Sequence, residues 1–157
     1  MQWQEVCEHP SLRNLPFKIE LNEKGQILMS PVKIYHSAFQ GKISRLLPKH
    51  GVVLAECAIK TSRGTKVADI AWCSEERFAR IEQEAECSIA PEVCIEVVSS
   101  SNTSSEMEEK RALYISAGAI EFWVCNENGN MAFFDENGQL KTSVLIPEFP
   151  HKVKIIT

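Results

Sequence analysis

Residues 93–125 decide the fold, and they read VCIEVVSSSNTSSEMEEKRALYISAGAIEFWVC. The apolar run at 93–98 has the length of a strand, and residues 120–125 form a second such run. Between them, the segment TSSE at 103–106 matches a capping box, so a helix should begin there and end at Gly118. A strand, a helix and a strand in this order form a crossover that pairs the two strands in parallel.

The rest of the chain adds hairpins and helices around this βαβ unit. The pattern of apolar residues between turn residues predicts strands at 17–21, 26–29, 52–61, 66–72, 131–134, 140–145 and 153–156, and helices at 35–47 and 75–86. Hairpins place antiparallel strands beside the parallel pair, so we expect an α/β (α+β) fold with one mixed sheet. Residues 1–16 are expected to be an irregular lead-in to a single domain at 17–157.

Composition excludes several classes of protein. The 157 residues are 44% hydrophobic and 24% charged, which is typical of one globular domain. No stretch approaches the roughly 20 apolar residues of a membrane span, and the N-terminus lacks the features of a signal peptide, so we expect no membrane association. The six cysteines include no C-x-x-C pair and mostly lie in apolar runs, which predicts buried free thiols and a cytoplasmic location.

The net charge of −4 argues against a protein that coats nucleic acid without specificity. The charge is unevenly spread, because residues 1–66 hold 10 basic and 5 acidic side chains, whereas residues 67–157 hold 7 basic and 16 acidic ones. This asymmetry leaves room for one positive face.

Two strands each carry a carboxylate inside an apolar run, Asp69 in VADIAW and Glu96 in VCIEVV. Strands that are apolar on both faces are normally buried on both faces, and a buried carboxylate is costly unless it is paired, protonated or bound to a metal ion. At about 100° per residue, Lys110 falls in the middle of the apolar stripe of the predicted helix. Two inward carboxylates and an inward lysine predict a site where Mg²⁺ activates water at a phosphoryl group.

Each of these three residues also has a structural interpretation. Asp69 could be bonded to backbone amides, Glu96 could form an ion pair with Lys110, and Lys110 could extend along the apolar surface to reach water. The joint occurrence of the three residues favours the functional interpretation.

Four segments together resemble a known family. They are Leu28-Met29-Ser30-Pro31 followed by His36, the strand Ala68–Ala71, the string Glu96–Ser99, and Lys110-x-x-x-Tyr114-x-x-x-Gly118-x-x-Glu121-x-Trp123. From about Leu21 to Val124 the chain resembles the bacterial "putative restriction endonuclease" domain family of the PD-(D/E)XK nuclease superfamily. The resemblance implies a restriction endonuclease-like mixed β-sheet flanked by helices, and an endonuclease that uses Mg²⁺ or Mn²⁺ to cleave DNA.

The resemblance also implies roles for individual residues. Asp69 matches the first acidic metal ligand, Glu96 matches the second, and Val97 matches a residue whose carbonyl binds the metal. Other members of the superfamily carry a lysine where Val98 stands here. In this branch the lysine lies on the following helix, at the position of Lys110.

Further candidates surround these residues. A supporting role behind the metal ligands, or an additional acidic ligand, is predicted for His36, Gln40, Glu20 and Glu56. Phosphate contacts are predicted for the basic hairpin residues Lys60, Arg63 and Lys66, which would otherwise form a solvated turn. The alternative function is a catalytically inactive nuclease-fold domain that binds a protein or a nucleic acid, and a homodimer is left open in either case.

Overall fold

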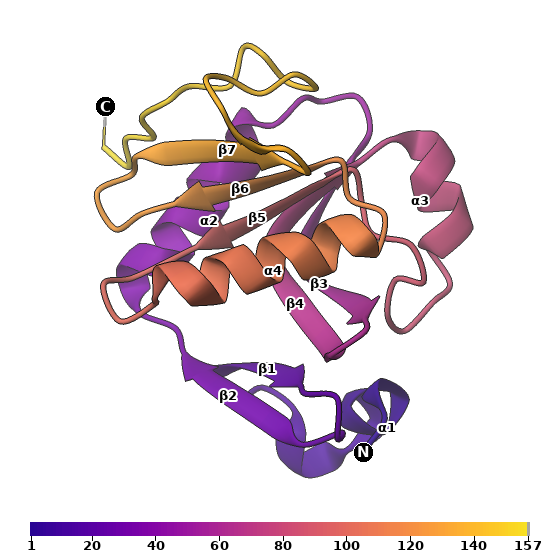
Figure 1. Cartoon of the computed structure of the whole chain (residues 1–157). Helices are drawn as coiled ribbons and strands as arrows, with labels where there is room; N and C mark the ends of the chain where they lie inside the picture. Colours follow the sequence, from indigo (N-terminus) through magenta and orange to yellow (C-terminus); the bar gives the residue numbers. More distant parts are fainter. Residues whose placement is uncertain (157) are drawn as a thin grey trace.

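The computed structural model describes residues 1–156, and its centre is a six-stranded sheet with the strand order β3-β4-β5-β6-β7-β8 (Figure 1). The strands are β1 (Phe17–Leu21), β2 (Ile27–Pro31), β3 (Val52–Thr61), β4 (Gly64–Cys73), β5 (Val93–Val97), β6 (Glu121–Cys125), β7 (Met131–Asp135) and β8 (Gly138–Leu140). The α-helices are α1 (Trp3–Glu8), α2 (Ile34–Leu46), α3 (Glu75–Ile81) and α4 (Ser104–Ser116), and a short 3-10 helix spans Pro10–Leu12.

The βαβ unit predicted from residues 93–125 is confirmed. Strands β5 and β6 pair in parallel, and β3–β4, β4–β5, β6–β7 and β7–β8 pair antiparallel. Helix α4 begins after Thr103, whose hydroxyl accepts a hydrogen bond from the N–H of Glu106 at 3.2 Å. Gly118 follows the helix with φ +120°, a conformation that favours glycine.

Helices cover both faces of the large sheet (Figure 1). On one face, Phe39 and Ile43 of α2 pack against a core that includes Trp123 of β6. On the other face, Tyr114 of α4 and Ile81 of α3 join a second buried cluster. The alternation of side chains along β5 therefore directs its odd-numbered residues to the α2 face and its even-numbered residues to the α4 face.

Strands β1 and β2 form a separate two-stranded sheet that lies beside the end of β4 (Figure 1). Gly64, the first residue of β4 after the β3–β4 turn, has φ +89°, and a Cβ atom there would overlap the carbonyl oxygens of Leu21 and Asn22. The ammonium of Lys66 donates to the Leu21 carbonyl oxygen at 3.3 Å. The hairpin thus rests directly on the backbone of the β3–β4 turn.

We expect Gly64→Ala to lower the free energy of unfolding by about 1–3 kcal/mol, because it combines a strained φ with a backbone overlap. Urea denaturation would measure this change. Gly41→Ala is the matched control, since Gly41 lies inside α2 with open space around it, and alanine there should stabilise the protein by up to about 1 kcal/mol. A Gly64→Ala protein as stable as the unaltered chain would contradict the close packing of the hairpin.

Several predicted elements differ from the structure. Residues 3–8 of the lead-in form helix α1, whose Val6 is buried, so this segment is not irregular throughout. The helix predicted at 75–86 ends at Ile81, because the following segment turns to pair with β3, where the N–H of Cys87 donates to the carbonyl of Ala58 at 2.7 Å.

The strands predicted at 140–145 and 153–156 are wrong. The backbone N–H groups of Val144 and Leu145 donate to the carboxylate of Glu121 instead of to a neighbouring strand. Residues 153–156 contain no strand, and the N–H of Val153 donates to the carbonyl of Gly129. These backbone N–H groups thus bond to a side-chain carboxylate or to a single carbonyl, and not to a neighbouring strand as the alternating pattern predicted.

The cysteines are free, and five of the six are buried, with Cys7 exposed. In the part of the chain that the structure describes, no helix has the length and apolar character that crossing a membrane requires.

Candidate active site

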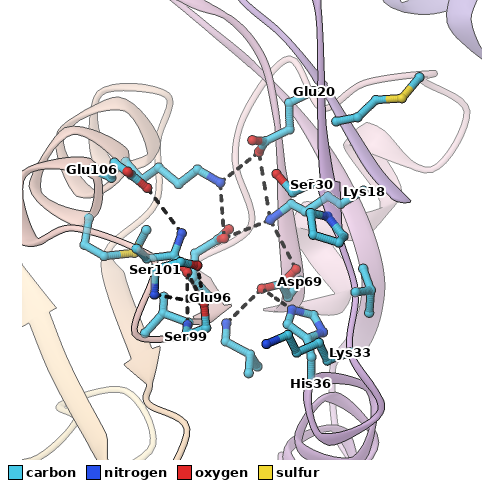
Figure 2. Close-up of a pocket in the computed structure, with 18 of the residues that line it drawn as sticks. Lys18, Glu20, Ser30, Lys33, His36, Asp69, Glu96, Ser99, Ser101 and Glu106 are labelled. Carbon is cyan, nitrogen blue, oxygen red and sulfur yellow. Dashed lines mark hydrogen bonds and ion pairs between the residues drawn. The ribbon is translucent and has the colours of Figure 1, made fainter. Parts of the chain in front are cut away.

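A cavity of about 270 Å³ lies between the β1–β2 hairpin, the start of α2, the middle of β4, the C-terminal end of β5, and α4 (Figure 2). The three predicted catalytic residues, Asp69, Glu96 and Lys110, all line it. Lys18, Glu20 and His36 line it as well. Residues from five separate elements therefore meet at one place.

Asp69 is 1% exposed, and its two carboxylate oxygens have different surroundings. Oδ2 accepts the backbone N–H of Val97 at 2.8 Å and lies 3.2 Å from Nε2 of His36. Oδ1 lies 3.1 Å from the Nζ atom of Lys18. Burial raises the pKa of Asp69, but the charge of Lys18 and the contact with His36 outweigh it and hold the pKa at about 2. Asp69 is therefore ionised, with Oδ2 held by the protein and Oδ1 turned toward Lys18.

Glu96 is held in a similar way from the α4 face of β5. Its Oε2 accepts the hydroxyl hydrogen of Tyr114 at 3.0 Å, and its Oε1 lies 3.2 Å from Nζ of Lys110. Burial is the largest influence and raises the pKa of Glu96 above its usual value. Lys110 thus faces Glu96, as the position of Lys110 on the apolar stripe of the helix predicted.

Glu20, one of the further candidates from the sequence, lies together with Asp69 and Glu96 in one group of carboxylates, here called the acidic cluster. Its Oε2 accepts the backbone N–H of Val67 at 2.7 Å and contacts Nζ of Lys110 at 2.9 Å. Burial raises the pKa of Glu20, but the positive charges of Lys110 and Lys18 outweigh it, so the pKa is lowered. The hairpin therefore contributes an acidic group from outside the main sheet.

Sequence reasoning missed Lys18, whose Nζ atom lies at the centre of the cluster (Figure 2). This nitrogen is 2.8 Å from Oε1 of Glu96, 3.1 Å from Oδ1 of Asp69 and 3.9 Å from Oε2 of Glu20. Burial lowers the pKa of Lys18, but the three carboxylates outweigh it and raise the pKa above the usual value. One signal could have found it, because residues two apart in a strand share a face, and Lys18 shares that face with Glu20.

Two of the supporting candidates contact Asp69 directly. His36, in the first turn of α2, contacts its carboxylate; burial lowers the pKa of His36, but the bond to Asp69 outweighs it and raises the pKa. Gln40, one turn later, donates through Nε2 to the backbone carbonyl of Asp69 at 2.7 Å and to Oε1 of Glu56 at 2.9 Å. Glu56 is exposed, has φ +52° and does not line the cavity. Glu56 therefore contacts the back of the site through Gln40.

The basic residues of the β3–β4 hairpin, Lys60, Arg63 and Lys66, do not line the cavity. Lys60 lines a different hollow, next to the N-terminal residues. Nη1 of Arg63 pairs with Oε1 of Glu109 at 2.8 Å, and Lys66 donates to the carbonyl of Leu21. The role of these three residues as phosphate contacts stays a prediction.

The carboxylate groups of the cavity are ligands that fit a hard divalent cation, although the ammonium group of Lys18 lies between them. Carboxylate oxygens are the ligands that Mg²⁺ and Mn²⁺ prefer, and Oδ1 of Asp69 is buried without a hydrogen bond from the described residues. Val97, the predicted carbonyl ligand, also lines the cavity. Within residues 1–156 no three acidic, histidine or cysteine side chains are grouped to hold a metal ion as they stand. The carboxylates converge on Lys18 instead.

Comparison with known proteins agrees with the sequence resemblance. A family model described as "Putative restriction endonuclease", Uma2, matches residues 3–152. The fold is similar to a crystal structure described as a putative nuclease belonging to DUF820 from Anabaena variabilis, with 18% sequence identity, a TM-score of 0.70, and coverage of 98% of this chain and 94% of that one. No match is found among curated proteins. The predicted restriction endonuclease-like fold is thereby confirmed, and because the family model spans nearly the whole chain, the protein belongs to the Uma2 family, whose description is "Putative restriction endonuclease".

Proposed function

We propose that the protein is a Mg²⁺- or Mn²⁺-dependent DNA endonuclease that hydrolyses phosphodiester bonds through a PD-(D/E)XK-type site whose lysine lies on α4. The observation that supports this most directly is the meeting of Asp69, Glu96 and Lys110 in one cavity. These three residues come from three elements and were selected from the sequence pattern alone. Membership of the family supports a nuclease-like function.

Asp69, Glu96 and the carbonyl of Val97 are the groups that would hold the divalent cation. When bound, such a cation supplies an activated water and neutralises charge on a phosphoryl oxygen. The protein positions these ligands through fixed bonds, because the N–H of Val97 holds Oδ2 of Asp69, and the hydroxyl of Tyr114 holds Oε2 of Glu96. Each carboxylate thus keeps its other oxygen facing the ammonium of Lys18.

Lys110 is proposed to orient the attacking water or to stabilise the negative charge that develops on the phosphate. Its ammonium lies 3.2 Å from Oε1 of Glu96 and 2.9 Å from Oε2 of Glu20, so it stands beside a proposed ligand. A compact ammonium on a flexible stem suits this role.

We propose DNA as the substrate, with binding that is weak and sensitive to salt because the net charge is −4. The cytoplasmic location and the homodimer remain predictions.

We expect the unaltered protein to nick supercoiled DNA in the presence of Mg²⁺ or Mn²⁺, and Lys110→Met to nick it about 100-fold more slowly, because methionine keeps the unbranched stem of the side chain but removes the ammonium group and its charge. Single-turnover cleavage followed on agarose gels would measure the rate. Lys24→Met is the control, since Lys24 is exposed in the turn between β1 and β2. The proposal fails if the unaltered protein does not cleave with either cation, and the role of Lys110 fails if Lys110→Met cleaves at the original rate.

One observation favours the second candidate function, an inactive nuclease-fold domain that binds protein or nucleic acid. Lys18 and Lys110 pair with the three carboxylates of the acidic cluster, so most of its charge is balanced without a metal ion. Calorimetric titration with Mn²⁺ separates the two candidates, because an inactive domain of this kind would bind no divalent cation.

A further inference from the structure

We infer that Lys18 occupies the cation position of the site and that a divalent cation binds only by displacing its ammonium group, so that Lys18 competes with the metal ion and weakens its binding. This inference rests on the proposed function, because it concerns how the same site takes up its cofactor. It assigns a role to a residue that the sequence pattern did not indicate.

The distances support competition for one position. The Nζ atom of Lys18 lies 2.8 Å from Oε1 of Glu96 and 3.1 Å from Oδ1 of Asp69. These are the two oxygens that Val97 and Tyr114 leave available to bind a cation. Magnesium binds oxygen at about 2.0–2.1 Å, so an ion that contacts both oxygens would lie in the same gap as the ammonium. Two cations at that separation overlap and repel each other.

The position of Lys18 in the fold allows its side chain to leave while its backbone stays. Lys18 pairs with Ser30 in the β1–β2 ladder, and the same hairpin rests on the turn at Gly64. The side chain has four flexible carbons and lines the cavity, which offers space into which the ammonium can swing. Displacement therefore requires a rotation of one side chain and no change in the fold.

The other lysine of the cluster does not play the same part. Lys110 contacts Glu96 and Glu20, and its ammonium makes no ion pair with Asp69 within residues 1–156. Lys18 contacts all three carboxylates and thus bridges the two proposed metal ligands. Removing the charge of Lys18 leaves Oδ1 of Asp69 without its cation and the gap open.

Isothermal titration calorimetry with Mn²⁺ on the full chain tests the inference. We expect Lys18→Met to bind Mn²⁺ at least about tenfold more tightly than the unaltered protein, because the competing charge is gone. Lys33→Met is the matched control, since Lys33 lines the same cavity but takes part in none of the ion pairs between residues 1 and 156, and its affinity should change less than about twofold.

The outcomes separate this inference from the proposed function. If the unaltered protein and Lys18→Met bind Mn²⁺ equally, or if the variant binds more weakly, the competition is refuted and the metal site stands. If neither protein binds Mn²⁺, both ideas are refuted. Circular dichroism on each variant shows whether it is folded.

A second measurement uses the unaltered protein and so does not depend on the folding of a variant. Acetylation by an N-hydroxysuccinimide ester, followed by peptide mass spectrometry, reports how accessible each lysine is. We expect Mn²⁺ at a saturating concentration to speed the modification of Lys18 at least about fivefold and to leave Lys33 unchanged, because the displaced ammonium loses its carboxylate partners. A rate at Lys18 that Mn²⁺ does not change would overturn the inference.

Discussion

Asp69→Asn should reduce metal-dependent nicking of supercoiled DNA by at least about 100-fold, which is the scale expected for the loss of a group that positions charge at the reacting centre. The amide can still accept the N–H of Val97 through its oxygen, as Oδ2 does now. It then places an NH₂ group where Oδ1 faces Lys18, and an NH₂ group neither binds a divalent cation nor accepts from an ammonium.

The measurement is a single-turnover rate with Mg²⁺, together with a Mn²⁺ titration that should show no binding to the variant. Asp135→Asn is the matched control, because it makes the same chemical change at a turn where Oδ1 accepts the N–H of Asn137, away from the cavity. Asp69→Asn cleaving at the original rate would show that Asp69 is a structural carboxylate and not a metal ligand.

Glu121→Leu should produce the largest loss of stability, about 3–5 kcal/mol in the free energy of unfolding. Glu121 is 1% exposed, and both of its carboxylate oxygens accept hydrogen bonds from the protein. Oε1 accepts the indole N–H of Trp123 at 2.8 Å and the hydroxyl of Ser143 at 2.6 Å, and Oε2 accepts the N–H groups of Val144 and Leu145 at 2.9 and 3.0 Å. Leucine has a similar size but leaves all four donors without an acceptor.

Urea unfolding would measure this change, with Glu127→Leu as the control, because Glu127 is exposed in the turn after β6 and its loss should change the stability by less than about 0.5 kcal/mol. A difference below about 1 kcal/mol between Glu121→Leu and the unaltered protein would contradict the structural role of Glu121.

Glu121 also shows how far the sequence could distinguish functional from structural carboxylates. Like Asp69 and Glu96, it lies in an apolar strand and is buried. The difference lies in the partners, since residues 143–145 of a distant loop satisfy Glu121, whereas Lys18 and the cavity face Asp69 and Glu96. These partners are set by the tertiary structure, and a strand pattern does not reveal them.

The elements predicted correctly were those specified by local signals. The unit at residues 93–125 carries its own cap, periodicity and terminal glycine, so its strands, helix and parallel pairing followed from the sequence. Lys110 was placed correctly for the same reason, since the helical period fixes its direction. The basic residues of the β3–β4 hairpin lie away from the cavity, because a hairpin carries its tip away from a residue in the middle of its strand.

Lys18 needed information that no local pattern contains. Its neighbours in sequence form an ordinary hairpin, and only the docking of that hairpin against β4 brings its ammonium to carboxylates on β4 and β5. The sequence showed that Lys18 and Glu20 share a face, but not what that face contacts.

The separation of the β1–β2 hairpin from the main sheet means that the acidic cluster is assembled from two sheets, of which the hairpin is the smaller unit. Side-chain bonds, such as those of Glu20 to the N–H of Val67 and of Lys66 to Leu21, join the hairpin to β4, and the strands of the two sheets are not paired with each other. Opening of such a unit requires less free energy than global unfolding. Concentrated salt weakens ion pairs, so we expect it to loosen the hairpin and the cluster before the six-stranded sheet unfolds. Loss of the cluster and loss of the fold would then be separate events for this protein.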